Sequence, residues 1–285
     1  MKQSMRYPAH AASPRAPSST DAGAAVADGS AAQSPVPLLW TGGWDSTFQL
    51  LRLLFAQGRE VAPFYLMDER RASTAIELAT MDRIRDAIAH RDPDAGRRLL
   101  PTRTCAVSSL RPDAAIARAF DDAVRASFMG DQYGWLAAFC RQHGLSDMQL
   151  CIHRDDKAHA ALEPYVTGRV ERDGVRTYRV DPRYAALPQH TVFAAFAFPL
   201  FDLGKVDMAE RAAANGWTEL MRMTWFCHRP RRNGQPCGRC NPCLYTIDEG
   251  LGWRLPASSR AASVVERALL RPLKRAAKAA LRRGR

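Results

Sequence analysis

Short apolar runs alternate with helical periods in the first part of the chain. Residues 36–39 form an apolar run of strand length, and residues 48–55 place apolar side chains at helical spacing. The same order returns with a strand-like run at 60–67 and a helical period at 73–89. This βαβα order predicts an α/β fold with a doubly wound parallel sheet, in which ligands bind at the carboxyl ends of the strands.

Weaker signals predict the rest of the domain. Residues 148–152 form an apolar run that ends at four polar residues, His153-Arg154-Asp155-Asp156. We expect a strand that brings these side chains to the ligand-binding edge, although four polar residues also fit a solvated turn. Further expected elements are a strand near 105–107, helices over 113–143 with breaks near Gly130 and Gly134, either a strand or a buried helix over 190–198, and a helix over 206–215 capped by Gly216.

An Asp-Gly pair, Asp173-Gly174, separates alternating runs at 166–170 and 175–180. Asp-Gly favours the tight turns that join antiparallel strands. The sequence therefore predicts a β-hairpin, near 166–180, inserted into the α/β domain.

Two glycines and several hydroxyl side chains follow the first predicted strand. The sequence Thr41-Gly42-Gly43-Trp44-Asp45-Ser46-Thr47 joins that strand to the next helical period. Glycines can take positive φ and let a ligand reach the backbone, while the free N–H groups at the start of a helix favour an anion. Neither G-x-x-x-x-G-K-[ST] nor G-x-G-x-x-G fits this stretch. The turn predicts a phosphate site, with an ordinary glycine turn before a polar helix start as the alternative.

Four of the seven cysteines are close together, with the spacing C-x9-C-x2-C-x2-C. Four thiolates are a ligand set of structural zinc, so the spacing favours zinc. An iron–sulfur cluster uses the same ligands at similar spacing, and free or disulfide-bonded cysteines are a third interpretation. The four residues are Cys227, Cys237, Cys240 and Cys243.

Length and composition indicate one main globular domain, since the chain has 285 residues, 46% of them hydrophobic and 25% charged. No apolar run reaches the roughly 18–20 residues that span a bilayer, and the N-terminus lacks the apolar core of a signal peptide. We therefore expect a cytoplasmic protein. Residues 1–34 are rich in Ala, Ser and Pro without an apolar period, which predicts a disordered leader.

The net charge of +12 comes mainly from the end of the chain. Residues 254–285 hold ten Lys and Arg and one Glu, which gives +9 and leaves about +3 for the rest. Residues 272–283 have an amphipathic helical period. These features predict a basic amphipathic tail that binds RNA, DNA, an anionic membrane or an acidic protein, or else packs its Ala and Leu side chains on the body.

The order of these motifs resembles a known enzyme family. Residues 41–46 are similar to the S-G-G-x-D-S loop of the PP-loop ATP pyrophosphatases, with Thr41 in the first position. Pro199-Leu200-x-x-Leu203-x-Lys205, and Thr224-Trp225-Phe226-Cys227 before the last three cysteines, extend the resemblance over about residues 36–250 to the 7-cyano-7-deazaguanine synthase (QueC-like) family. The resemblance implies a PP-loop fold of adenine nucleotide alpha-hydrolase type with a C-terminal four-cysteine zinc-binding unit.

For function, the resemblance implies an AMP-forming ligase of queuosine biosynthesis. ATP would be cleaved between its α and β phosphates with the help of Mg²⁺. A carboxylate such as 7-carboxy-7-deazaguanine would be adenylated, amidated by ammonia and dehydrated to the nitrile. Asp45 and Lys205 would be catalytic. The other implied ligands are Thr41, Gly42, Gly43, Asp45, Ser46 and Thr47 for the phosphates, Leu66 and Met67 for adenine, and Cys227, Cys237, Cys240 and Cys243 for zinc.

The chain departs from that family at three places. Residues 130–134 replace a Pro-Gly-Arg-Asn segment, residues 153–156 stand where Gly-x-x-x-x-Asp is expected, and the hairpin is added. A related enzyme acting on another carboxylate or base therefore stays open, as does a zinc-ribbon nucleic-acid-binding module with a degenerate loop. The expected partners are a small-molecule carboxylate, ammonia, a polyanion at the tail and a second copy in a homodimer. The expected regions are the disordered leader (1–34), the PP-loop ATP-binding α/β domain with its hairpin (35–222), the four-cysteine zinc-binding unit (223–253) and the basic tail (254–285).

Overall fold

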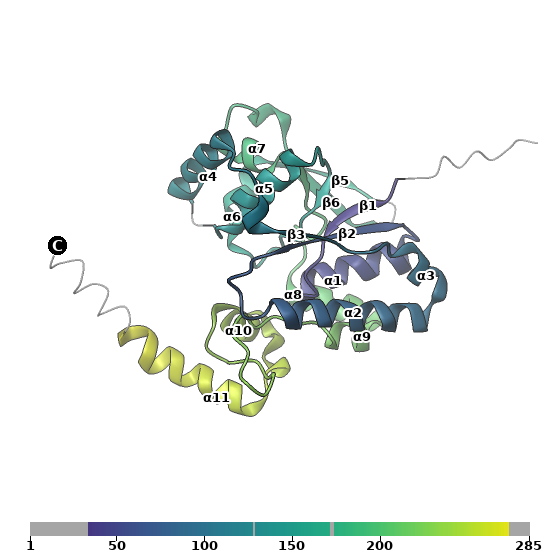
Figure 1. Ribbon diagram of the computed structural model, residues 1–285, viewed down its shortest axis with the longest axis vertical. Coiled ribbons are helices and arrows are strands. Elements are labelled where there is room, and N and C mark those ends of the chain that lie inside the picture. The colour runs from purple at the N-terminus through teal and green to yellow at the C-terminus, as the bar shows by residue number, and fades with distance from the viewer. Residues whose placement is uncertain (1–33, 128, 172–173, 274–285) are drawn as a thin grey trace, which may run out of the picture. The chain divides into compact units, whose positions relative to one another are not determined.

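The computed structural model describes residues 34–127, 129–171 and 174–273 (Figure 1). A five-stranded sheet lies at its centre, and every neighbouring pair of strands is parallel. In sheet order the strands are β3 (Arg103–Ala106), β2 (Val61–Met67), β1 (Val36–Leu39), β4 (Met148–Gln149) and β7 (Phe196–Ala197). The order reverses between β1 and β4, and doubly wound sheets bind ligands at such a reversal.

Helices cover both faces of the sheet, because its strands are apolar on both sides. Leu38 and Leu39 are neighbours in β1 and point into different cores. The core with Leu38 includes α1 (Trp44–Leu51), α2 (Thr74–Arg91), α3 (Pro93–Arg98), α8 (Lys205–Ala214) and α9 (Thr218–Arg222). The core with Leu39 includes α4 (Ala114–Ala126), α5 (Gln132–Gln142), α6 (Lys157–Leu162) and α7 (Pro188–Phe193). The predicted α/β class with a parallel sheet is confirmed.

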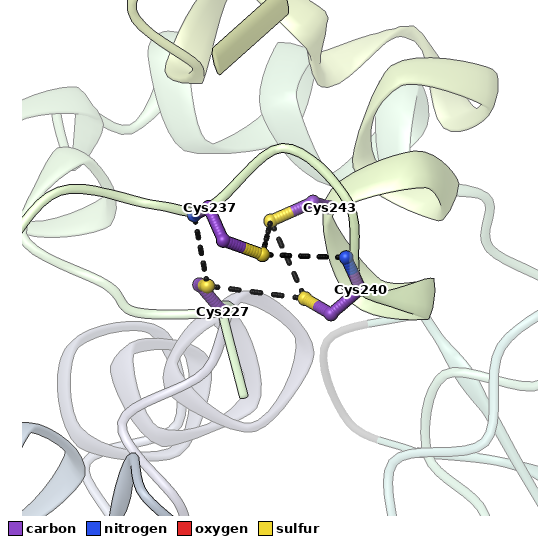
Figure 2. A group of neighbouring side chains, drawn as sticks. All are labelled: Cys227, Cys237, Cys240 and Cys243. Carbon is purple, nitrogen blue, oxygen red and sulfur yellow. Dashed lines mark hydrogen bonds between the residues drawn. The ribbon is translucent and has the colours of Figure 1, made fainter. Parts of the chain in front are cut away.

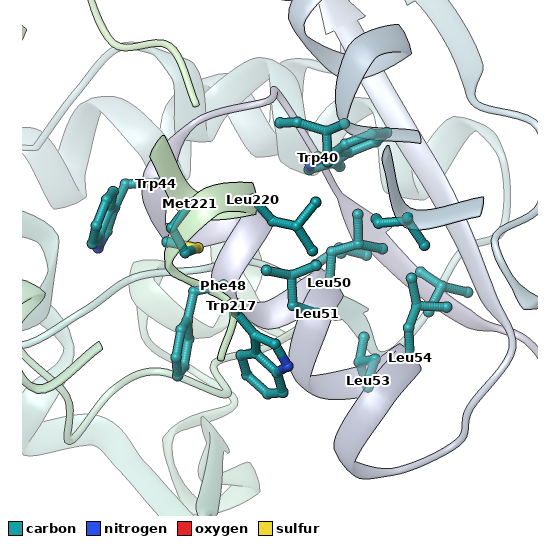
Figure 3. Packing of buried hydrophobic residues seen from close by; sticks show 14 of the residues in the cluster. Trp40, Trp44, Phe48, Leu50, Leu51, Leu53, Leu54, Trp217, Leu220 and Met221 are labelled. Atoms are coloured by element: carbon teal, nitrogen blue, oxygen red, sulfur yellow. The ribbon is translucent and has the colours of Figure 1, made fainter. Parts of the chain in front are cut away.

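Helix α1 is held firmly in the first core. Leu50 and Leu51 are fully buried, and Figure 3 shows Leu220 of α9 lying beside them. The ring of Trp217 packs edge-on against Phe48, with centroids 6.1 Å apart. Each such buried side chain contributes about 1.5–3 kcal/mol. The turn that precedes α1 is therefore attached to a rigid helix.

The predicted helix break near Gly130 is confirmed, but the one near Gly134 is wrong. Helix α4 ends at Ala126 and α5 begins at Gln132, so Gly134 lies inside α5. A Cβ on Gly134 would lie 3.2 Å from the ring of Phe120 in α4. This glycine lets two helices approach closely and does not end a helix.

The stretch over 190–198 contains both of its predicted alternatives. It begins in α7, which ends at Phe193, and then forms β7 beside β4. The strand expected at 148–152 pairs only over Met148–Gln149. Beyond it, the Leu150 N–H still donates to the Ala197 carbonyl at 2.9 Å.

The predicted hairpin is present as β5 (Val166–Val170) and β6 (Arg176–Val180), an antiparallel pair. Tyr178 and Phe198 exchange backbone hydrogen bonds of 3.0 and 2.7 Å. The hairpin is therefore attached to the main sheet next to β7.

Residues after the cysteines pack onto them. Helix α10 (Asn241–Thr246) contains Cys243, and α11 (Ala257–Val265) lies against the cysteine loop. The Ser263 hydroxyl donates to the Gly238 carbonyl at 2.6 Å, and the Ser259 hydroxyl donates to the Pro236 carbonyl at 2.5 Å. Thus the chain from residue 254 to α11, assigned from sequence to the tail, is packed on the cysteine unit.

Short 3-10 and π-helical turns connect these elements. The 3-10 turns are η2 (Val107–Ser109), η3 (Glu163–Tyr165), η4 (Pro182–Tyr184) and η6 (Gly252–Arg254), and the π-helical turns are η1 (Arg52–Ala56), η5 (Ile247–Leu251) and η7 (Glu266–Leu270). The predicted leader, apart from Ser34, and residues 274–283 of the predicted tail helix lie outside the described residues. Among the helices that are described, none has the length and apolarity needed to cross a membrane.

Candidate functional site

The glycine turn lies at the carboxyl end of β1, where the strand order reverses. Gly42 has a φ of +66°, and a Cβ there would lie 3.1 Å from the Met81 side chain of α2. Gly43 is the residue before α1, and its carbonyl accepts from the Thr47 N–H at 3.1 Å. The Trp225 N–H donates to the Gly42 carbonyl at 2.9 Å. The turn is therefore fixed between α2 and the segment that leads to the cysteines.

The hydroxyl side chains of the turn have different surroundings. The Ser46 hydroxyl accepts from the Thr41 N–H at 3.4 Å, and both residues line a cavity above the sheet edge. Thr47 is fully buried, and its hydroxyl accepts from the Trp40 indole at 3.1 Å. Thr47 thus belongs to the core side of α1, whereas Thr41 and Ser46 face the space where the sequence predicts phosphates.

Asp45 and Lys205 are brought together from positions 160 residues apart in the chain. The Lys205 Nζ lies 3.1 Å from Asp45 Oδ2 and 3.3 Å from Glu249 Oε2. His153 Nε2 lies 3.8 Å from Asp45 Oδ2. Asp45 Oδ1 is buried without any hydrogen-bond partner among the described residues. A buried carboxylate oxygen with no partner is a costly arrangement that suits a ligand of a cation.

The charges of this cluster are set by burial and by one another. Burial alone would raise the pKa of Asp45, but nearby Lys205, His153 and Arg254 outweigh it, and the pKa lies below its ordinary value. Burial would lower the pKa of Lys205, but Asp45 and Glu249 raise it. Burial raises the pKa of Glu249, and Lys205 offsets this only in part. At neutral pH Asp45 is therefore ionised and Lys205 is protonated.

A cavity of about 290 Å³ opens above the carboxyl ends of β1, β2 and β4. Its polar wall includes Thr41, Gly43, Asp45 and Lys205, and its apolar wall is formed by residues that include Leu39, Phe64, Leu66 and Leu136. Leu66, predicted to contact adenine, lines this space. Gly42, Thr47 and Met67, which were also predicted as ligands, are not among the described residues that line it.

A second cavity, of about 1050 Å³, adjoins the first. Both are lined by Asp45, Lys205, Tyr133 and His228, so the ion pair lies where the two spaces meet. Protein sites for small molecules commonly have volumes of about 300–1,000 Å³. The arrangement can hold two ligands side by side, with the Asp45–Lys205 pair between them.

Arg254 lines the first cavity, although the sequence placed it at the start of the basic tail. Its guanidinium contacts two aromatic rings, 4.8 Å from the centroid of Trp44 and 4.7 Å from that of Phe226. It donates to the Thr224 carbonyl and hydroxyl, both at 2.6 Å. Burial lowers its pKa to about 10, with Asp45 opposing this effect. Arg254 remains a cation at neutral pH.

The four predicted metal ligands form one compact group (Figure 2). Their sulfur atoms all lie within 4.8 Å of one another. The Cys227–Cys240 and Cys237–Cys243 sulfurs are 3.8 Å apart, and the Cys240–Cys243 sulfurs are 3.4 Å apart. A tetrahedral ion with sulfurs at about 2.3 Å separates them by about 3.8 Å, so this group can hold a metal such as zinc.

Backbone N–H groups also point at these sulfurs. Cys227 Sγ accepts from the Cys237 N–H at 3.2 Å, and Cys237 Sγ accepts from the N–H groups of Arg239 and Cys240 at 3.3 Å. Gly238, between them, has a φ of +73°. Such hydrogen bonds stabilise thiolates, the form in which cysteine binds a metal.

Sequence reasoning did not identify Glu249 or Arg254 as site residues. Glu249 lies in the π-helical turn η5, and such turns are frequent at functional sites, but no spacing in the sequence marks one. Arg254 is one of the ten basic residues in 254–285, and no motif distinguishes it from the others. His153 was expected at the edge of the sheet, and it does lie beside Asp45.

Comparisons with known proteins add no name to this site. A scan against protein-family models finds no match, and a search of curated proteins finds none either.

Proposed function

We propose that this protein is an AMP-forming, ATP-dependent ligase of PP-loop type, resembling the 7-cyano-7-deazaguanine synthases. One observation supports this most. The turn Thr41–Ser46 lies at the strand-order reversal of a parallel sheet, with Asp45 and the distant Lys205 paired 3.1 Å apart beside a cavity. Backbone N–H groups at a helix start and a buried cation are the groups that stabilise a departing pyrophosphate.

In this proposal, ATP occupies the first cavity. The adenine lies against Leu66 and its apolar neighbours, and the phosphates lie at Thr41, Gly43 and Ser46. Lys205 contributes positive charge where negative charge develops on the leaving pyrophosphate. Asp45 holds Lys205 in place, and its Oδ1, which has no partner among the described residues, suits Mg²⁺. Bound Mg²⁺ would neutralise phosphate charge.

The second cavity takes the carboxylate substrate. A carboxylate oxygen attacks the α-phosphorus, and the bond to the β-phosphate oxygen breaks as pyrophosphate leaves. Ammonia in the proposal then attacks the acyl carbon, and AMP departs to leave the amide. A second ATP would adenylate the amide oxygen with release of pyrophosphate, and loss of AMP and of the two N–H protons would then give the nitrile. A substrate such as 7-carboxy-7-deazaguanine would carry its reactive group to the junction at Asp45 and Lys205. Zinc at the four cysteines would be structural.

The test is product analysis with a defined mixture. The protein is incubated with ATP, Mg²⁺, ammonium and 7-carboxy-7-deazaguanine, and AMP, pyrophosphate and nitrile are measured together. We expect AMP and pyrophosphate in equal amounts, and a loss of turnover of about 100-fold or more in Lys205→Met if it stabilises the leaving group. Release of ADP and orthophosphate would contradict the PP-loop assignment. Formation of AMP and pyrophosphate without the nitrile would reject only the proposed substrate and product.

A further inference from the structure

We infer that Arg254 binds the phosphate chain, and that the four-cysteine unit presents it to the glycine turn. This inference rests on the proposed function and extends it. It assigns a phosphate contact to a residue that follows the last cysteine and that no motif marks. It also gives the metal-binding unit a part in nucleotide binding.

The ion-pair partners of the cations in the first cavity support this assignment. Its Arg and Lys side chains are Arg71, Lys205 and Arg254. Arg71 pairs with Asp68 at 3.6 Å, and Lys205 pairs with two carboxylates. Within the described part of the chain, Arg254 pairs with no carboxylate; its partners are a neutral threonine and two rings. Asp45 offsets the burial of Arg254 only in part, since the pKa stays lowered, and an anionic ligand in direct contact would remove the remaining cost.

A second observation points to a ligand at the same place. Trp44, the first residue of α1, lines the cavity and is only 4% exposed. Its indole N–H has no hydrogen-bond partner among the described residues. The guanidinium of Arg254 lies against this same ring. Among the described residues, the start of α1 therefore combines a donor without a partner, a helix terminus and an arginine that forms no ion pair, all of which favour a phosphate.

The cysteine unit determines where Arg254 lies. Phe226, one of the two rings that Arg254 contacts, directly precedes Cys227. Thr224 accepts the two hydrogen bonds that Arg254 donates. The next residue, Trp225, donates its N–H to the Gly42 carbonyl. On the other side of Arg254, Leu255 is buried in the cluster that contains Cys227 and Cys243. Metal binding would order this cluster, so metal and phosphate should each strengthen binding of the other.

The first test measures pyrophosphate binding with Mg²⁺ by calorimetry. Arg254→Met keeps an apolar side chain against the rings but removes the charge, and we expect a loss of affinity of about 10- to 100-fold. Arg254→Lys should show a smaller loss, because it keeps the charge without the planar fork. The matched control is Arg118→Met, which removes an exposed arginine of α4 that lines neither cavity.

The second test measures zinc release to a chromogenic chelator. We expect pyrophosphate with Mg²⁺ to slow the release from the wild-type protein, and this protection to be absent in Arg254→Met. Arg118→Met should be protected like the wild type. Melting curves and zinc content establish that each variant is folded and loaded before comparison.

The outcomes separate this inference from the proposed function. If the wild-type protein does not bind pyrophosphate, the proposed function fails. If it binds, but folded Arg254→Met binds within twofold of wild type, Arg254 only holds neighbouring segments in place and the inference is wrong. If pyrophosphate leaves zinc release unchanged in the wild type, the coupling is wrong.

Discussion

At the scale of single residues, the site depends on two features. Some backbone positions admit only glycine without a conformational cost, and several ionisable side chains have pKa values shifted by burial and by neighbouring charges. Gly42 combines a positive φ with close contacts to α2, whereas Gly58 has a similar φ of +59° and no atom within 4 Å of an added Cβ. Comparing substitutions at the two positions therefore separates the cost of backbone strain from the cost of crowding neighbouring atoms. Burial raises the carboxyl pKa of both Asp45 and Glu249, but neighbouring cations outweigh burial only at Asp45.

We predict that Gly42→Ala destabilises the protein more than Gly58→Ala. Both variants force alanine into the left-handed region, at about 1–2 kcal/mol. Gly42→Ala also presses its Cβ on Met81 and Thr80, which adds about 1–3 kcal/mol. Chemical denaturation measures both free energies of unfolding. Equal losses would show that α2 adjusts freely around the turn.

We predict opposite pH dependence for Asp45→Asn and Glu249→Gln. Because the folded state lowers the pKa of Asp45 below 3.8, its ionisation adds stability above that pH, and the addition is lost as pH falls further. Because the folded state raises the pKa of Glu249 above 4.5, its ionisation subtracts stability as pH rises through and beyond 4.5.

Denaturation between pH 3 and 7 tests both signs. The stability of Asp45→Asn relative to wild type should improve as pH falls below about 4. The relative stability of Glu249→Gln should instead improve as pH rises above about 4.5. A relative stability of Glu249→Gln that falls with rising pH would mean that its pairing with Lys205 outweighs its burial.

At the scale of elements, the cysteine loop and α11 are built as one piece. A Cβ on Gly238 would overlap the Ser259 carbonyl of α11, and a backbone atom cannot move aside as a flexible side chain does. Gly234, in the same loop, has a φ of +76° but no atom within 4 Å of an added Cβ. This pair of glycines tests whether α11 is needed for the metal site.

We predict that Gly238→Ala displaces α11 and weakens metal binding, whereas Gly234→Ala retains the metal. The added Cβ must separate the loop from Ser259 and Ser263, whose hydroxyls bond the loop carbonyls. We expect zinc to leave Gly238→Ala at least about 10-fold faster, the effect commonly produced by loss of groups that support metal ligands. Equal zinc release from the two variants would show that the metal site does not depend on the packing of α11 against the loop.

At the scale of the whole molecule, the α/β domain and the cysteine unit share one site. The two parts meet where Trp225 bonds Gly42 and where Arg254 contacts Trp44. Lys205, at the start of α8, pairs with Asp45 of α1 and with Glu249 of η5. Loss of order in the cysteine unit should therefore disturb the conformation of the glycine turn.

We predict about one zinc ion per chain and its loss in Cys240→Ser. Removing one thiolate leaves an incomplete ligand set, and the unit should become sensitive to proteolysis while the sheet stays folded. Cys105→Ser changes a thiol outside the cluster and should keep the metal. Metal analysis and limited proteolysis measure these outcomes. Iron-dependent visible absorption in anaerobically prepared protein would contradict the zinc assignment.

The sequence by itself determined the features that depend on neighbouring residues. Apolar runs and helical periods predicted the strands and helices of the parallel sheet, because backbone pairing and side-chain spacing act over a few residues. Asp173-Gly174 marked the hairpin for the same reason. The spacing of the four cysteines brought them together as predicted, since their loop is short and turns at Gly238.

Only the tertiary structure decided which distant side chains share a site. Gly134 looked like a helix break, yet its contact with Phe120 of another helix explains it. Thr47 belongs to the turn motif, but the rotation of α1 directs it to Trp40. Arg254 reaches the first cavity and Glu249 the second because the cysteine unit folds back onto the turn. Such contacts depend on how whole elements pack, and that packing is not contained in the local spacing of residues.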